Sequence, residues 1–141
     1  MKALFKLVFS IAAALSRLTG GRIGGKVQGL PVLLLTTTGR KSGKRRVTPV
    51  GYFEADGGYV IVASNAGFDK HPGWYHNLKH YPRVTFEIRG RRATALAATA
   101  GPDLRARLWA RLMELAPGYG AYQKRTRHEI PIVLLQPEAK V

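Results

Sequence analysis

The chain has 141 residues, of which 45% are hydrophobic and 22% charged, a composition typical of one globular domain and not of a disordered chain. Lysine and arginine number 23 against 8 acidic residues, and the net charge of +15 indicates an anionic partner: nucleic acid, a membrane surface or a polyanionic small ligand. There are no cysteines, which excludes disulfides, thiolate zinc sites and cysteine nucleophiles.

The first segment, residues 2–18, predicts an amphipathic helix with its polar side chains near one narrow stripe. Its uncharged run, Leu7 to Ser16, is too short to span a bilayer. Three interpretations stay open: packing on the domain, contact with an anionic membrane interface, or a secretory signal peptide, against which Lys6 argues. Glycines then predict a hinge, which divides the chain into residues 1–25, helix and hinge, and a domain over 26–141.

The rest of the chain alternates apolar strands with helices. The predicted strands are 31–38, 47–54, 59–64, 84–88, 92–99 and 130–136. The predicted helices are 72–80, 101–115 and a short one within 117–127. Hairpin signals at Asp56-Gly57-Gly58 and Arg89-Gly90-Arg91 make the strands mostly antiparallel. The pattern predicts an α+β fold with a closed or nearly closed β-barrel.

A basic loop, Gly39–Arg46, follows the first of these strands, and five of its eight residues are cationic. Its glycines let backbone N–H groups turn inward as in anion-binding nests, and arginine and lysine bind phosphate or carboxylate oxygens. Three preceding threonines and Ser42 add hydroxyl donors. The loop is not a Walker loop, because Lys44 is followed by arginine rather than serine or threonine. We interpret it as a site for a phosphate or carboxylate group, with a solvated turn as the alternative.

A second candidate site runs from Ala63 to Leu78, where a strand ends in a small polar loop that leads into a helix. Backbone N–H groups at such a helix start bind phosphates or the carbonyls of a planar ring. Trp74 and Tyr75 lie in the first helical turn and offer walls for a flat ligand. The alternative for Trp74 is a core anchor.

Residues for metal, nucleophilic or paired-carboxylate chemistry are sparse. His76 and His80 share a helix face, but asparagine stands where a His-Glu-x-x-His motif has its glutamate, so we expect no metal site. We expect His128 to make structural hydrogen bonds. The sequence presents no evident Ser/His/Asp triad or carboxylate pair. Such a chain, rich in anion-binding groups, suits a protein whose cofactor carries the chemistry.

Two tyrosines, Tyr119 and Tyr122, lie three residues apart, so a short helix places them on one face. They offer apolar walls and hydroxyl donors that suit an electron acceptor. Packing at the barrel mouth is the alternative.

Five motifs in this order resemble the deazaflavin (coenzyme F-420)-dependent nitroreductase and quinone reductase family. They are LLTTTGRKSG (34–43), VIVAS (60–64), KHPGWYHNL (70–78), PRVT (82–85) and IPIV (130–133). Their order and spacing match over roughly residues 28–138. The resemblance implies an α+β split β-barrel of the pyridoxamine-phosphate-oxidase type with an N-terminal helix. It also implies coenzyme F-420, whose phospholactyl and oligoglutamyl tail suits a basic loop better than FMN does.

The resemblance further implies site residues. Those holding the cofactor phosphate are Arg40, Lys41, Ser42 and Gly43, with Lys44 and Arg45 near the glutamates. Those meeting the deazaflavin ring are Ser64, Asn65, Ala66 and Gly67, with Lys70 and Trp74 beside it. Candidates for stabilising or protonating the acceptor are Ser64, Tyr122 and Tyr119.

The implied activity is hydride transfer from reduced F-420 to a quinone such as menaquinone, or to a nitro-aromatic compound. Because menaquinone lies in the bilayer, the N-terminal helix fits a cytoplasmic protein with peripheral contact on the inner face of an actinobacterial cell membrane, as a monomer or homodimer. An FMN- or haem-using split barrel and a non-catalytic deazaflavin-binding protein are the alternatives. We expect no nucleic-acid binding, because aromatic residues do not interleave with the basic loop.

Overall fold

The computed structural model describes residues 26–138, so the predicted N-terminal helix and hinge lie outside the described residues. The strands are β1 (Lys26–Val27), β2 (Leu30–Thr38), β3 (Arg45–Ala55), β4 (Gly58–Val62), β5 (Arg83–Ile88), β6 (Arg91–Thr99) and β7 (Ile132–Pro137). The helices are the 3₁₀ turn η1 (Asn65–Gly67), α2 (Gly73–His80), α3 (Pro102–Leu115) and α4 (Tyr119–Arg125). The six predicted strands and three predicted helices are confirmed, and the two-residue β1 was not predicted.

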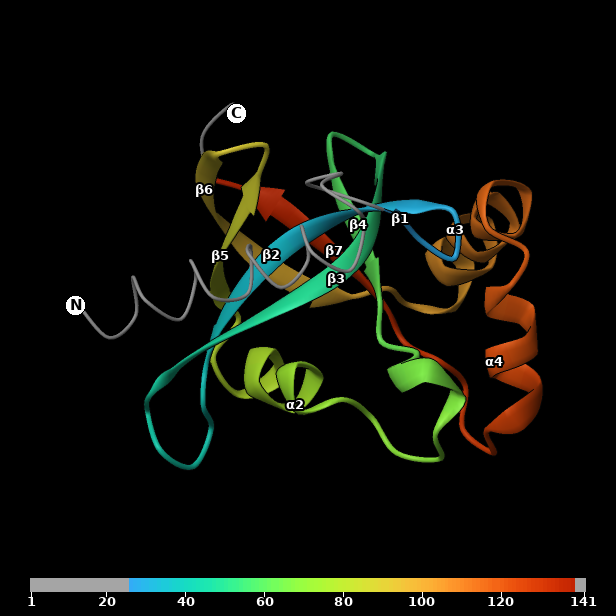
Figure 1. The fold of residues 1–141 in the computed structure, drawn as a ribbon, viewed down its shortest axis with the longest axis horizontal. Coiled ribbons are helices and arrows are strands. Elements are labelled where there is room, and N and C mark those ends of the chain that lie inside the picture. Colours follow the sequence, from blue (N-terminus) through green and yellow to red (C-terminus); the bar gives the residue numbers. More distant parts are fainter. Residues whose placement is uncertain (1–25, 139–141) are drawn as a thin grey trace.

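These strands form one antiparallel sheet in the order β1-β2-β3-β4-β7-β6-β5. The sheet closes into a barrel because β5 pairs back onto β2, with Leu35 opposite Phe86. Figure 1 shows α2 across one end of the barrel, with α3 and α4 together on one side. The closed barrel with inserted helices confirms the predicted α+β class.

Two-residue turns with positive φ at both positions join three pairs of neighbouring strands. This geometry matches the twist of antiparallel strands. The turns are Gln28-Gly29, Asp56-Gly57 and Arg89-Gly90. The last two confirm the predicted hairpins.

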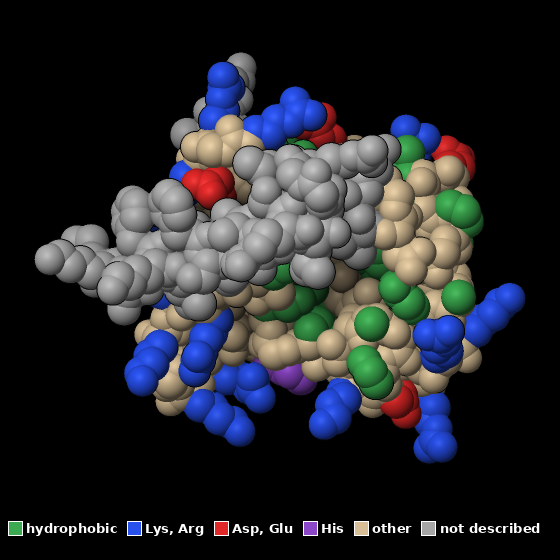
Figure 2. All heavy atoms as spheres, in the orientation of Figure 1, with side chains coloured by type: hydrophobic (Ala, Val, Ile, Leu, Met, Phe, Trp, Pro, Cys, Tyr) green, Lys and Arg blue, Asp and Glu red, His purple; other side chains and the backbone are tan. Residues whose placement is uncertain are grey.

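Basic side chains dominate the surface. In the view of Figure 2, lysine and arginine side chains lie along the lower edge of the molecule. They gather at the left, where Figure 1 places the β2–β3 loop, and at the right around α4. Several carboxylates are already paired with arginine, as Asp56 with Arg107 at 2.8 Å and Glu138 with Arg83 at 2.8 Å. The remaining basic charge is available to an anionic ligand.

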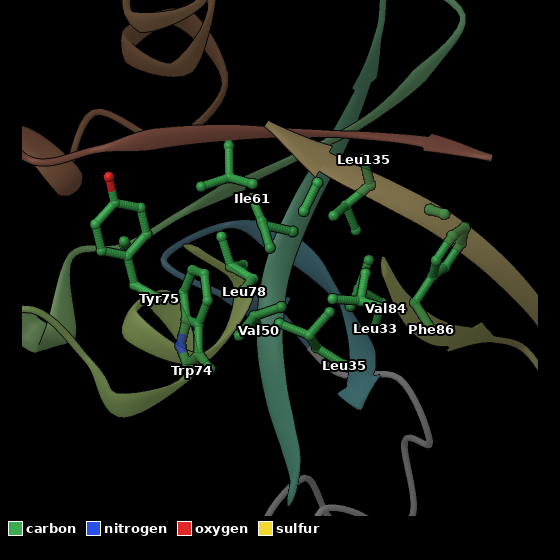
Figure 3. Close-up of a cluster of buried hydrophobic side chains, with 14 residues drawn as sticks. Leu33, Leu35, Val50, Ile61, Trp74, Tyr75, Leu78, Val84, Phe86 and Leu135 are labelled. Atoms are coloured by element: carbon green, nitrogen blue, oxygen red, sulfur yellow. The ribbon is translucent and has the colours of Figure 1, made fainter. Parts of the chain in front are cut away.

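The sheet is buried on both faces where β4 and β7 run. Ile61 and Leu135 point into the barrel, whereas their neighbours Val60 and Leu134 pack against α3 and α4. Figure 3 shows side chains of α2, including Trp74, closing the barrel beside Val50 and Ile61. The first residues after β4 therefore emerge where the barrel, α2 and α4 meet. None of the helices within residues 26–138 is long and apolar enough to cross a membrane.

Candidate functional site

A cavity of about 670 Å³ lies where the β2–β3 loop, β3, the end of β4, α2 and α4 meet. It is lined by Gly39, Arg40, Lys41, Ser42, Arg46, Thr48, Pro49, Val50, Gly51, Val62, Ser64, Asn65, Ala66, Pro72, Gly73, Trp74, Asn77 and Tyr119. Its volume is within the range of small-molecule and cofactor sites. The fold thus brings together the basic loop, the segment after β4 and one tyrosine of α4.

The cationic end of this cavity is a tightly closed loop. The Gly39 N–H donates to the Lys44 carbonyl at 2.7 Å, and the Gly43 N–H donates to the Gly39 carbonyl at 2.8 Å. A Cβ on Gly39 would lie 2.7 Å from the Ser42 hydroxyl oxygen and 3.2 Å from the Lys44 carbonyl oxygen, so a larger residue would require Ser42 to shift. The loop is therefore held in shape while its basic side chains stay exposed.

A buried asparagine fastens this loop to α2. The Oδ1 atom of Asn77 accepts from the Arg40 N–H at 3.1 Å, and its Nδ2 donates to the Thr37 hydroxyl at 3.2 Å. The same helix carries Trp74 one turn earlier. Asn77 thus sets the position of the loop relative to the aromatic wall. Sequence reasoning did not single it out, although a polar residue one turn from Trp74 on a core-facing helix was a usable signal.

Two adjacent arginines at the start of β3 face opposite sides of the strand. Arg46 pairs with Thr37 and lines the cavity, whereas Arg45 pairs with Thr38 and lines a separate hollow. The predicted loop ended at Arg46, but β3 begins at Arg45, so both residues follow the alternation of a strand. The sequence analysis included Arg46 in the basic loop but assigned it no role in the site.

The end of the cavity away from the basic loop is called the enclosed end here, because its lining residues Trp74 and Tyr119 are buried. It includes a strained turn. Three successive residues, Asn65, Ala66 and Gly67, have φ of 48°, 56° and 83°. For residues other than glycine this conformation costs about 1–2 kcal/mol each. The turn is held by the Gly67 N–H donating to the Ser64 carbonyl at 3.0 Å, and by the Asn65 side-chain amide donating to the Lys70 carbonyl at 3.0 Å. Strain of this kind persists where the surroundings over-determine it, often at ligand sites.

The two tyrosines of α4 occupy different environments. Tyr119 is 3% exposed and lines the cavity. Its pKa is raised to about 12, mainly by burial and to a smaller extent by the neighbouring Tyr122. Its hydroxyl is therefore protonated at physiological pH and can donate a hydrogen bond. The Tyr122 hydroxyl accepts from Nε2 of Gln28 at 2.7 Å, and its ring lies edge-on to Tyr119 at 5.6 Å.

The predicted site residues divide between the lining and its surroundings. Those in the lining are Arg40, Lys41, Ser42, Ser64, Asn65, Ala66, Trp74 and Tyr119. Those outside it are Gly43, Lys44, Arg45, Gly67, Lys70 and Tyr122. The roles implied for both groups remain predictions.

Three histidine rings cluster beside the start of α2. The His71 ring lies 4.2 Å from His128 and 5.7 Å from His76, centroid to centroid. The pKa of His71 is lowered, mainly by burial and further by the charges of His128, His76 and Lys79. His128 meets the Thr126 hydroxyl at 2.8 Å, which confirms its expected structural hydrogen bond. Within residues 26–138 no group of three His, Cys, Asp or Glu side chains is arranged to hold a metal ion.

A closed barrel with a cationic loop at one end of a cavity and aromatic walls at the other defines a cofactor-binding split barrel. The model of the F420H(2)-dependent quinone reductase family matches residues 9–137. The chain therefore belongs to the F420H(2)-dependent quinone reductase family, and the predicted family is confirmed.

Two relatives support this assignment. The F420H(2)-dependent quinone reductase Rv1261c of Mycobacterium tuberculosis is 42% identical over 127 residues, which covers 86% of this chain and 85% of the relative. The solved structure of an F420-H2 dependent reductase, FDR-A, has a TM-score of 0.67 at 36% identity and covers 74% of this chain and 92% of its own.

A more distant likeness shows the fold alone. A Listeria innocua protein described as a candidate pyridoxamine 5′-phosphate oxidase has a TM-score of 0.52 at 12% identity, covering 77% of this chain and 84% of its own. Together with FDR-A it confirms the predicted split barrel.

Proposed function

We propose that this chain is an oxidoreductase that transfers a hydride from reduced coenzyme F420 to a quinone. The observation that carries the proposal is that one cavity joins the basic loop to an enclosed aromatic wall, in a chain of the F420H(2)-dependent quinone reductase family. Such a cavity accommodates a ligand with an anionic part and a flat part.

The residues present fit this cofactor. Arg40, Lys41 and Arg46 lie at the same end of the cavity and supply guanidinium and ammonium donors for a phosphate. Trp74, which is 8% exposed, forms a rigid wall beside which a planar ring can stack. A Cβ on Gly51 would lie 2.9 Å from the Tyr119 hydroxyl oxygen, so a larger residue at this position would displace that hydroxyl from its place in the cavity lining.

We assign the predicted roles as follows. The phosphate is held by Arg40, Lys41, Ser42 and Gly43, with Arg46 added to this group. Lys44 and Arg45 lie toward the glutamates of the tail. The ring lies along Ser64, Asn65, Ala66 and Gly67, with Trp74 and Lys70 beside it.

Bound in its reduced form, coenzyme F420 supplies a hydride. Negative charge then develops on an oxygen of the acceptor, and the chain must stabilise it. The Tyr119 hydroxyl donates a hydrogen bond or a proton to this oxygen, and the Ser64 hydroxyl is the second donor. Tyr122 acts through its edge contact with Tyr119 and not directly. Val62 and Trp74 exclude water from this end of the cavity.

The finer parts of the proposal concern partners and location. Nitro-aromatic compounds are planar acceptors of similar size and fit the same cavity. Phe68 is 68% exposed and follows the lining residue Ala66 by two positions, with Lys70 two positions further on. An exposed aromatic and a basic side chain here suit peripheral contact, from the cytoplasm, with an anionic bilayer that holds a quinone acceptor. A homodimer is supported by a structural neighbour described as a domain-swapped dimer, 30% identical with a TM-score of 0.69, covering 91% of this chain and 98% of its own.

The test is a fluorescence titration of the purified protein with oxidised F420 beside FMN, followed by anaerobic oxidation of reduced F420 with a soluble menaquinone analogue. Tight F420 binding, weak FMN binding and quinone-dependent turnover support the proposal. Preference for FMN replaces it with the FMN-using alternative. F420 binding without turnover with any quinone or nitro-aromatic compound indicates a non-catalytic carrier.

A further inference from the structure

The helix that carries Tyr119, α4, depends on other elements for its position. It spans only Tyr119–Arg125, and helices shorter than about 12 residues are not stable alone in water. Near its C-terminal end the side chain of Gln123 donates to the His128 carbonyl and accepts from the Ile130 N–H, both at 2.9 Å. The start of the helix, where Tyr119 lies, must be fixed by other contacts.

The start of α4 is contacted by the turn between β1 and β2, which Figure 1 shows reaching toward α3 and α4. In this turn Nε2 of Gln28 donates to the Tyr122 hydroxyl at 2.7 Å, although the two residues are 94 positions apart. The same amide lies against the backbone of Gly118, where an added Cβ would overlap Oε1 of Gln28. One exposed side chain thus reaches both the residue before α4 and a tyrosine of its first turn.

Tyr122 is held at two points. Its hydroxyl accepts from Gln28, and its backbone passes so close to the strained turn that a Cβ on Gly67 would lie 3.2 Å from its Cα. The Tyr122 ring meets the Tyr119 ring edge-on, at 5.6 Å between centroids and 89° between planes. Edge-to-face aromatic pairs keep a defined geometry, so the position of the Tyr122 ring constrains that of Tyr119.

We propose that Gln28 is a positioning residue, which acts through Tyr122 to hold the Tyr119 hydroxyl where it donates to the acceptor. This inference rests on the proposed function, in which Tyr119 is the donor. The Tyr119 hydroxyl lies beside Gly51 of β3, so a small displacement of α4 changes its distance from a ligand in the cavity. Reaction rates are sensitive to such displacements.

The experiment measures the turnover number, the F420 dissociation constant and the free energy of unfolding. Gln28→Met keeps the length of the side chain but removes the hydrogen-bond donor. Gly118→Ala leaves Gln28 and Tyr122 in the chain, but its Cβ displaces the Gln28 amide. The backbone of Gly118, with φ of −57° and ψ of −25°, accepts alanine without strain.

Two further variants serve as rescue and control. Gln28→Glu tests rescue, because a carboxylate on a side chain of the same length can accept from the Tyr122 hydroxyl. Arg89→Met is the matched control, because Arg89 is exposed, has φ of 50° in the same position of the β5–β6 turn and lies outside the cavity lining.

Gln28→Met and Gly118→Ala should each lower the turnover number about threefold, with the F420 dissociation constant unchanged. Gly118→Ala should not lower the free energy of unfolding, so turnover and stability separate. Gln28→Glu should retain most of the turnover of the wild type, and Arg89→Met all of it. In a Tyr119→Phe background Gln28→Met should have no further effect, because no hydroxyl is left to position.

A readout without cofactor is the nuclear magnetic resonance spectrum of the free protein with isotope-labelled tyrosine. Gln28→Met and Gly118→Ala should shift the Tyr119 ring resonance, which is assigned by its absence in Tyr119→Phe, whereas Arg89→Met should not. An unmoved resonance, or an equal loss of turnover in the Tyr119→Phe background, overturns the positioning role and leaves the proposed function standing. A wild-type protein that does not oxidise reduced F420 with any quinone overturns both.

Discussion

The two ends of the cavity differ in burial and chemistry. Arg40, Lys41 and Arg46 are exposed at one end, whereas Trp74 and Tyr119 are 8% and 3% exposed at the other. Charges on exposed side chains act over distance and tolerate small displacements. Side chains that hold a ring or donate a proton need fixed geometry. The cationic end is therefore expected to govern affinity and the enclosed end the rate.

Asn77 joins these two ends. Its side chain holds the backbone of Arg40 and the hydroxyl of Thr37, while its helix places Trp74. Buried polar groups with both partners satisfied specify one arrangement, because breaking either bond leaves an unpaired group. The cationic end and the enclosed end thus keep one spacing, as the proposed cofactor requires.

The largest expected effect is loss of affinity at the cationic end. Replacing Arg40 and Lys41 together by alanine removes two charged donors, and we expect the dissociation constant for F420 to rise about 100-fold, or about 2.7 kcal/mol. The turnover number at saturating F420 should change little. Fluorescence titration and steady-state kinetics measure both. The control double variant Arg91→Ala with Arg92→Ala removes the same charge elsewhere, and an equal loss there would make the effect one of net charge.

Next is the strained turn of the enclosed end. Gly67 has φ of 83°, and an added Cβ would lie 3.2 Å from Tyr122 and Arg125. We expect Gly67→Ala to lower the free energy of unfolding by about 2 kcal/mol, from backbone strain and crowding together. Gly57 is the control, because its φ of 75° is similar but an added Cβ would meet no atom within 4 Å. Gly57→Ala therefore measures backbone strain alone and should lower the free energy of unfolding by about 1 kcal/mol. Urea unfolding measures both, and equal costs would mean that contacts around the turn do not fix it.

A smaller effect is expected at Tyr119. Tyr119→Phe keeps the wall but removes the hydroxyl donor, so the turnover number should fall about tenfold while the F420 dissociation constant stays unchanged. Tyr122→Phe should reduce turnover less, because its hydroxyl bonds Gln28. Single-turnover kinetics with a quinone separates the chemical step from product release. A larger loss in the Tyr122 variant would reverse the assignment.

Sequence could predict the parts of this site that depend on local patterns. The glycine-bounded basic loop, the turn after β4 and Trp74 are each defined by neighbours within a few residues. The role of Asn77 could not be predicted, because its hydrogen-bond partners Thr37 and Arg40 lie 40 and 37 residues away in the sequence. The sequence could not distinguish Tyr119 from Tyr122, because residues three apart lie on the same face of a helix. The packing of α4 on η1, and the hydrogen bond that Tyr122 accepts from Gln28 in the turn after β1, distinguish them.

The barrel itself was predictable because strand alternation and turn residues agree along most of the chain. β1 was the exception, since two residues carry no period. The start of β3 was placed two residues late because Arg45 and Arg46 continue the charge of the loop. Within β3 the side chains alternate, so Arg46 faces the cavity and Arg45 faces away from it. With the strand starting at residue 47, this alternation could not be applied to the two arginines, and Arg45 alone was given a role in the site.

The smallest expected effect is a pH dependence that arises mainly from His71. Lysine and arginine do not titrate near neutral pH, but His71 does. Its pKa is lowered in the folded chain by burial and by His128, His76 and Lys79. Just below the ordinary histidine value of 6.5, the unfolded chain therefore binds more protons than the folded one. Stability should fall as the pH drops through this window and level off below the lowered pKa.

Urea unfolding on both sides of pH 6.5 measures this slope. His71→Leu should flatten it, because leucine does not titrate and removes the Nδ1 atom that is buried without a hydrogen-bond partner among the described residues. His76, whose pKa is lowered by burial and then by Arg40 and Lys79, should leave a remaining slope of the same sign. An unchanged slope in the His71 variant would assign the effect to His76, which faces the cationic loop, and the two ends would then share their pH dependence.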